Sequence, residues 1–185
     1  MLKNRWARIV LGSTFLEGIF MFGAFAYVGS ELHVRFGLSL GVVGAMLASF
    51  GAGALFYSST AGTLMSRFGQ PGLVAVGGSV LAAGYAILGL MPSAWLAPPA
   101  IALIGLGYYM LHTTLQTNAT QMAPEARGLA VSLFAIALFT GQSVGVALAA
   151  PIMDRYGGRP IFLATALAIL AIAFWFRRQL VRQPA

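Results

Sequence analysis

The sequence predicts an all-α membrane protein with six transmembrane helices in a single domain that covers residues 1–185. Of its residues, 59% are hydrophobic and only 8% are charged, and the mean hydropathy is +0.85. A soluble domain usually carries about 25% charged residues, because a small globule exposes much of its surface to water. So few charges cannot cover a water-exposed surface, and most of this chain is therefore expected to lie in lipid.

A helix needs about 20 consecutive, mostly apolar residues to cross the hydrocarbon core of a bilayer. Six segments meet this requirement, and the links between them contain glycine or proline. In chain order the segments are 9–29, 40–62, 73–90, 95–117, 128–150 and 161–176. None of the links is long enough to hold a soluble domain.

The first segment, 9–29, has two possible interpretations. Lys3, Arg5 and Arg8 precede it, as in a signal peptide, and Ala24-Phe25-Ala26 resembles a cleavage site. Against cleavage, Glu17 interrupts the apolar run, and signal-peptide cores rarely contain a carboxylate. We therefore interpret this segment as the first spanning helix.

The second and fifth segments carry small residues at helical spacing. Ala48 and Ala52 lie four apart in the second segment, and Gly141, Gly145 and Ala149 follow the same spacing in the fifth. Helices in lipid associate through close packing, so small residues mark their contacts. Both segments are expected to pack tightly against other helices.

The 11 lysine and arginine residues indicate the orientation in the membrane. With the N-terminus inside, the inner side holds Lys3, Arg5, Arg8, Arg67, Arg127, Arg177, Arg178 and Arg182, whereas the outer side holds Arg35, Arg155 and Arg159. This excess predicts a multi-pass protein of the plasma (inner) membrane with both termini in the cytoplasm. The net charge of +7 does not indicate nucleic-acid binding, because the basic residues lie at the ends of apolar runs.

Two links resemble each other. Met65-Ser66-Arg67-Phe68-Gly69 follows the second segment and Met153-Asp154-Arg155-Tyr156-Gly157 follows the fifth, close to half the chain further on. Three crossings separate the two copies, so the second copy is inverted relative to the first. This pattern predicts a 3+3 inverted repeat, which is an architecture of secondary transporters.

These residues also resemble a known family. Residues 62–69 resemble the loop signature of the major facilitator superfamily, and residues 141–151 are similar to its glycine-rich antiporter helix. Residues 154–159 look like its outer turn before the last helix. The resemblance implies the C-terminal six-helix half of a twelve-helix transporter, paired with an N-terminal half or a second copy. Ser66 departs from the family pattern, which has aspartate there.

Ionisable residues inside a spanning helix are expensive and often functional. Glu17 lies roughly 13 Å into the bilayer, at ~1.5 Å per residue from Arg8, and His112 lies at a similar central depth. A histidine titrates near neutral pH and can carry a proton. We expect Glu17 and His112 to couple transport to protons, although a hydrogen-bonding strut between helices is the alternative for each.

Other polar residues complete the predicted site. Tyr108 and Gln116 share one helix face with His112, and Gln142 lies at a similar depth, so these three are candidate substrate contacts. The family resemblance assigns loop gating to Arg67, Gly69, Asp154 and Arg155. Asp154 and Arg155 are expected to pair with each other, and Glu31, His33 and Arg35 are expected to lie solvated in an outer loop.

The leading hypothesis is one half of a secondary transporter, not an enzyme, that exports small organic or drug-like molecules in exchange for protons. Its partners would be this substrate, protons, the lipid bilayer and a second six-helix half. No metal site or cofactor is expected, because the chain has no cysteine, two histidines and four acids. The alternatives are a non-transporting fragment or assembly partner and, remotely, an intramembrane hydrolase, which would need a serine nucleophile beside a histidine.

Overall fold

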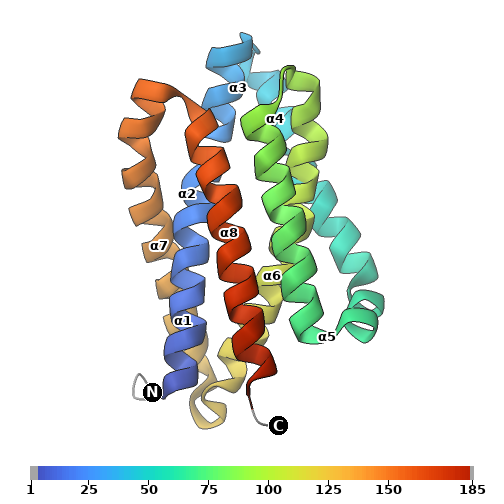
Figure 1. Ribbon diagram of the computed structural model, residues 1–185, viewed down its shortest axis with the longest axis vertical. Coiled ribbons are helices and arrows are strands. Elements are labelled where there is room, and N and C mark those ends of the chain that lie inside the picture. The colour runs from blue at the N-terminus through green and yellow to red at the C-terminus, as the bar shows by residue number, and fades with distance from the viewer. Residues whose placement is uncertain (1–3, 184–185) are drawn as a thin grey trace.

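A computed structural model describes residues 4–183, and all secondary structure in this range is helical. Lys3, which the orientation prediction uses, lies outside the described residues. The elements are α1 (Arg5–Glu17), the π-helix η1 (Gly18–Phe22), α2 (Gly23–Phe25), α3 (Val28–Phe36), α4 (Leu40–Leu47), α5 (Ser49–Leu90), the 3-10 helix η2 (Ala94–Leu96), α6 (Ala97–Gln121), the 3-10 helix η3 (Pro124–Ala126), α7 (Arg127–Tyr156) and α8 (Gly158–Val181). They form an elongated bundle in which the start of α1 and the end of α8 lie at the same end (Figure 1).

Within residues 4–183, five helical stretches are long and apolar enough to cross a membrane. They are Arg5–Phe36, Leu40–Leu90, Ala94–Gln121, Pro124–Tyr156 and Gly158–Val181. This number differs from the six predicted spans, because the second and third predicted segments lie in one stretch of 51 residues without a loop between them. A straight helix of that length, at about 1.5 Å per residue, would be more than twice as long as the ~30 Å bilayer core.

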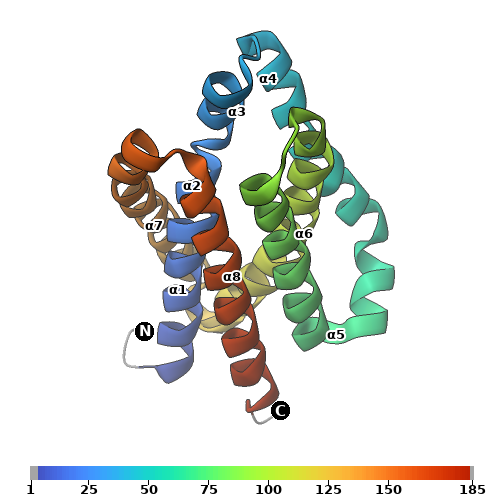
Figure 2. The same ribbon diagram turned by 45° about the horizontal axis from the view of Figure 1, so that its top comes forward.

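The 51-residue stretch is broken at Gly69, where φ is 61° and ψ is 178° and two helices meet. A Cβ atom makes this conformation costly, so glycine is almost the only residue that adopts it. Pro71 follows in the first turn after the break, where a helix does not need the missing N–H. Figures 1 and 2 show the chain running down to this bend and then back up the bundle.

Gly157 occupies the matching position of the sequence repeat and has nearly the same conformation, with φ 72° and ψ −172°. It separates the end of α7 from the start of α8. Both copies of the repeated sequence therefore end in a turn that requires glycine.

The end of the first stretch that lies furthest from the start of α1 corrects one expectation. Glu31 and Arg35, predicted in a solvated loop together with His33, belong to α3. The helix continues past the apolar run until Gly37, whose left-handed conformation at φ 66° ends it. His33 and Arg35 are exposed as expected, whereas Glu31 is buried. The prediction of a loop was wrong because hydropathy marks where a helix can cross lipid, not where its hydrogen bonding stops.

Glycines bring the first stretch and α7 into backbone contact. A Cβ atom on Gly141 would overlap the carbonyl oxygen of Phe15, and one on Gly145 would overlap that of Ile19. From the other side, a Cβ on Gly18 would overlap a carbonyl oxygen of α7. The prediction that the fifth segment packs tightly against another helix is confirmed.

The second segment was also predicted to pack tightly, through Ala48 and Ala52. These two residues do not make the contact, because both are exposed. The close contact of this segment with α6 is instead made by Gly53, where a Cβ would overlap the carbonyl oxygen of Ala102. Gly105 of α6 makes a similar approach to α5. Only glycine lets two helix backbones come this close, so the neighbouring alanines face outward.

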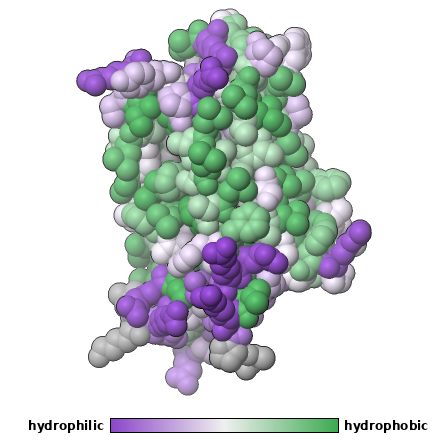
Figure 3. Space-filling model, in the orientation of Figure 1, coloured by the Kyte–Doolittle hydropathy of each residue, from purple (hydrophilic) through white to green (hydrophobic). Residues whose placement is uncertain are grey.

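The surface of the bundle is divided into bands. On the face shown in Figure 3, an apolar belt crosses the middle, with hydrophilic side chains gathered at the end that carries the start of α1 and a smaller group at the opposite end. This distribution matches a bundle that stands in a bilayer with its two polar ends in the headgroup regions.

Candidate functional site

Glu17 and His112 meet inside the bundle. Glu17 is the last residue of α1 and is fully buried, whereas the His112 side chain on α6 is 12% exposed. The Oε2 atom of Glu17 lies 2.8 Å from Nδ1 of His112. Its other oxygen, Oε1, is buried without a hydrogen-bond partner in the described part of the chain. The structure thus places a carboxyl group and an imidazole in direct contact between two spanning stretches.

Directly after Glu17, the chain forms the π-helix η1. Such single π-turns occur frequently at functional sites, because they redirect side chains and release backbone groups. Thr165 of α8 donates its hydroxyl proton to the Phe20 carbonyl at 3.3 Å, and Tyr85 of α5 donates to the Met21 carbonyl at 2.5 Å. Two neighbouring helices therefore hold the segment that positions Glu17.

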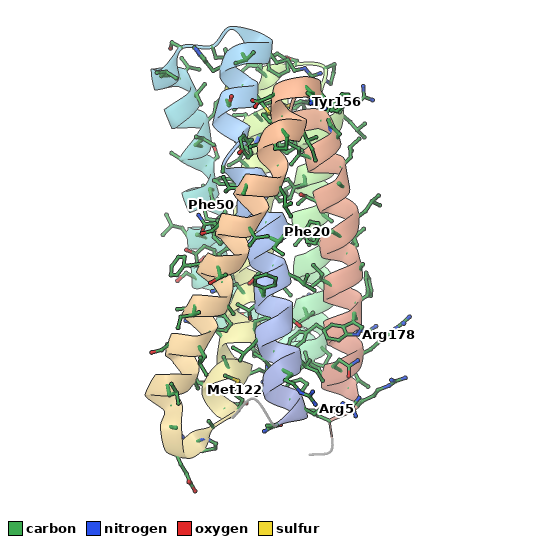
Figure 4. The ribbon with its side chains drawn as sticks, turned by 90° about the vertical axis from the view of Figure 1, so that its left-hand side faces the viewer. Arg5, Phe20, Phe50, Met122, Tyr156 and Arg178 are labelled. Carbon is green, nitrogen blue, oxygen red and sulfur yellow. The ribbon has the colours of Figure 1, made fainter. Side chains whose placement is uncertain are left out.

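Aromatic rings surround His112. Its imidazole stacks on Tyr108 with the ring centroids 4.7 Å apart, and Phe134 of α7 lies 5.2 Å away. Tyr108 in turn contacts Phe22 at 5.2 Å and Phe50 at 5.9 Å. Figure 4 shows Phe50 at the middle of the bundle, far from both polar ends. The imidazole is thus held in a mainly apolar, aromatic setting.

The predicted substrate contacts do not all join this cluster. Tyr108 is buried against His112, but Gln116 is exposed one turn further along α6. Gln142 is half-buried on α7, and its backbone nitrogen would lie 3.0 Å from a Cβ on Gly18, so its backbone passes close to Glu17. Tyr57 of α5 adds a further polar pair, since its hydroxyl lies 2.7 Å from that of Thr113.

At the turn around Gly69, a buried amide joins two helices. The Asn118 side chain of α6 donates a hydrogen bond to Gln70 Oε1 at 2.9 Å, directly after the glycine break. Arg67 is exposed, with its guanidinium 5.8 Å from the Phe68 ring. The bend is therefore held against α6 by a hydrogen bond from Asn118.

The opposite end has a polar cluster centred on Glu31. Its Oε2 accepts a 2.8 Å hydrogen bond from the Gly158 N–H at the start of α8, and its Oε1 lies 3.3 Å from Arg35. Arg35 also donates to the Met91 carbonyl, at the end of α5, at 3.1 Å. We call Glu31, Arg35, Met91 and Gly158 the outer cluster. The i,i+4 spacing of Glu31 and Arg35 was the signal in the sequence that could have indicated it.

The predicted pair of Asp154 and Arg155 does not form among the described residues, where Glu31 pairs with Arg35 and Glu17 contacts His112. Both side chains are exposed at the end of α7. Consecutive residues on a helix point in different directions, so neither side chain can easily reach the other.

Replacing Glu31 with glutamine is expected to lower the free energy of unfolding by about 2 kcal/mol, because hydrogen bonds to a charged group contribute about 1.5–3 kcal/mol. The variant loses charge-assisted bonds to Gly158 and Arg35. Unfolding by SDS titration in mixed micelles measures the change. Glu125→Gln, at an exposed position in η3, is the matched control and should unfold like the wild type. Equal stability of the two variants would show that the outer cluster contributes nothing.

Within residues 4–183 no group of three histidine or acidic side chains is close enough together to hold a metal ion. Residues 21–184 match the family described as transmembrane secretion effector. No solved structure matches the chain. The match covers most of the sequence and most of the helical bundle, and it agrees with the resemblance found in the loops and glycine-rich segment. The chain therefore belongs to the transmembrane secretion effector family of major facilitator-type membrane transporters.

Proposed function

We propose that this chain forms one half of a proton-coupled exporter for small organic or drug-like molecules. The observation that carries the proposal is the contact between Glu17 and His112, with 2.8 Å between Oε2 and Nδ1. Burying an ionisable pair in the apolar interior of a membrane protein costs free energy, and such residues typically mark transport pathways. In this proposal the pair takes up a proton from one side of the membrane and releases it to the other.

The geometry of the pair suits a group that changes its protonation. One carboxylate oxygen contacts His112, while Oε1 is buried without a partner among the described residues. A buried polar atom without a hydrogen bond costs about 1–3 kcal/mol, so this oxygen is open to a proton or to a donor on a substrate. A substrate that occupies Oε1 would compete with the proton, which is the basis of antiport.

We assign substrate contacts to Tyr108, which stacks on His112, and to Gln116 and Gln142, which lie on the neighbouring turns of α6 and α7. The rings near His112 offer an apolar wall for an organic molecule, and the two amides offer hydrogen bonds. Gln116 is exposed, so it would meet the substrate at the open side of the site. Sites for small molecules usually combine apolar walls with a few polar groups in this way.

The bend at Gly69 supports six crossings arranged as a 3+3 inverted repeat. It divides the longest stretch into two helices, and Gly157 repeats its unusual conformation at the matching position. Arg67 and Gly69 would then gate the inner side, while Asp154 and Arg155 gate the outer side. Both termini would lie in the cytoplasm, in the inner membrane, as the distribution of basic residues favours.

A second six-helix half, either an N-terminal half or a second copy, would close the site by alternating access. The exposed face of α7 supports the presence of such a partner. In the apolar part of the stretch Pro124–Tyr156, which contains α7, only 28% is buried inside the bundle, compared with 50% for the stretch Arg5–Phe36. Its exposed face carries the polar residues Ser132, Thr140 and Ser143 beside Phe139. Polar and small side chains on a spanning face indicate contact with protein, not lipid.

Inverted membrane vesicles from cells that express the chain test the function, with ethidium, tetraphenylphosphonium and erythromycin as probes. Acidifying the vesicle lumen by ATP-driven proton pumping should cause at least one probe to accumulate, because protons leaving the lumen drive uptake. A protonophore should abolish this accumulation, and vesicles without the chain should show none. Accumulation of none of the three probes, or accumulation that the protonophore leaves intact, contradicts the proposal.

The partner can be identified with a single introduced thiol, because the natural chain has no cysteine. Ser143→Cys on α7, labelled with a maleimide-benzophenone photocrosslinker, should capture a second six-helix polypeptide in native membranes. Leu167→Cys on the exposed face of α8 is the matched control and should capture lipid alone. Mass spectrometry of the products distinguishes a second copy from another chain. Lipid adducts alone at both positions would argue against a partner on α7.

A further inference from the structure

A cavity lies at the end of the bundle that carries the start of α1 and the end of α8. It has a volume of about 410 Å³, and it is remote from Glu17 and His112. Its lining comes from α1 and from the end of α8 with the two residues after it, and consists of Arg5, Trp6, Ile9, Gln179, Arg182 and Gln183. The two ends of the sequence thus build one site that neither end could form alone.

The polar side of this cavity is suited to an anion. Arg5 and Arg182 line it together with Gln179 and Gln183, and none of its lining residues is acidic. Guanidinium groups bind phosphate through paired, charge-assisted hydrogen bonds. Amide side chains can donate further hydrogen bonds to the remaining phosphate oxygens.

The other side of the cavity is apolar. Ile9 and the indole of Trp6 line it, and Trp6 stacks on Phe176 of α8 with 5.8 Å between the ring centroids. The cavity lies at the end of the bundle that carries the start of α1, the end at which Figure 3 shows hydrophilic side chains gathered beyond the apolar belt. A tryptophan at this level is typical of the membrane interface. The site therefore offers a phosphate-binding side and an apolar side in the region of the lipid headgroups.

We propose that this cavity binds the headgroup of one anionic phospholipid, with the phosphate between Arg5 and Arg182 and an acyl chain along Trp6 and Ile9. Basic pockets between helices on the cytoplasmic side are suited to such lipids, whose negative charge is concentrated in that leaflet. A bound lipid would join the first and last helices of the bundle. The proposal does not depend on the substrate or on the proton site.

Native mass spectrometry of the detergent-solubilised protein tests this site with an equimolar mixture of phosphatidylglycerol and phosphatidylcholine. The wild type should retain one phosphatidylglycerol in preference to phosphatidylcholine. The double variant Arg5→Gln/Arg182→Gln should bind phosphatidylglycerol about 30-fold more weakly, because two arginines no longer meet the headgroup. Arg177→Gln/Arg178→Gln removes the same charge near the same end of α8, which Figure 4 marks with Arg178, but neither residue lines the cavity. This control should stay within about threefold of the wild type.

A second measurement uses a variant in which Arg5 and Arg182 are unchanged. Of the three tryptophans, Trp6 alone remains in the variant Trp95→Phe/Trp175→Phe. Brominated phosphatidylglycerol should quench its fluorescence more strongly than brominated phosphatidylcholine does, and an excess of inorganic phosphate should leave this difference intact. Equal quenching by the two lipids, or equal loss of lipid from the two double-arginine variants, would overturn the proposal. Release of the lipid by inorganic phosphate would instead assign the cavity to a soluble anion.

Discussion

Replacing Glu17 with glutamine is expected to abolish the proton-driven accumulation of a transported probe while the bundle remains folded. Glutamine has nearly the same shape and can still contact His112, so the change in stability should be small, about 1 kcal/mol. It cannot bind and release a proton, and the buried pair of Glu17 and His112 would lose its carboxyl group. Transport of the probe down its own concentration gradient should persist, because it does not need the proton.

The measurement compares concentrative uptake with downhill equilibration in the vesicles described above. Glu125→Gln is the matched control, because it makes the same chemical change at an exposed position in η3 and should accumulate the probe like the wild type. His112→Gln should also lose concentrative uptake. Full accumulation in Glu17→Gln would remove Glu17 from the coupling mechanism and leave it as a strut between α1 and α6.

The second large effect is expected at the contact between the first stretch and α7. Gly145→Ala should lower the free energy of unfolding by about 3 kcal/mol, because an added methyl group overpacks a close contact. A Cβ at this position would overlap the carbonyl oxygen of Ile19, which is backbone and has little room to move. Gly141→Ala should act in the same direction, since its Cβ would overlap the carbonyl oxygen of Phe15.

Gly12→Ala is the matched control, because it lies on α1 and a Cβ there would meet nothing within 4 Å. It should leave stability unchanged or raise it by up to about 1 kcal/mol, since alanine favours a helix more than glycine does. SDS titration of Gly145→Ala, Gly141→Ala and Gly12→Ala measures the expected losses of stability and the expected gain. If Gly145→Ala unfolded like Gly12→Ala, the close contact with α7 would have no part in holding the bundle together.

The contact also has a consequence for the site. Gly18 directly follows Glu17, and a Cβ on Gly18 would overlap the carbonyl oxygen of Leu138. The depth and direction of the Glu17 side chain therefore depend on how closely α7 approaches. A variant that separates these helices should disturb Glu17 without altering it chemically.

The sequence alone was sufficient to predict that the chain is helical and lies in a membrane, since the length and hydropathy of a segment decide this locally. It also singled out Glu17 and His112, because an ionisable residue is conspicuous in an apolar run. The glycine spacing of Gly141 and Gly145 marked the close face of α7, although not the helix it contacts. These features depend on residues that are near one another in the chain.

Contacts between distant segments were decided only by the tertiary structure. The hydrogen bond of Glu17 to His112, the bonds of Glu31 to Gly158 and the joint cavity of Arg5 and Arg182 each join residues far apart in sequence. Which helices become neighbours, and how each is rotated, is set by backbone approaches at glycines across the whole bundle. Hydropathy carries no information about that rotation, so Glu31 was placed in solvent although the fold buries it.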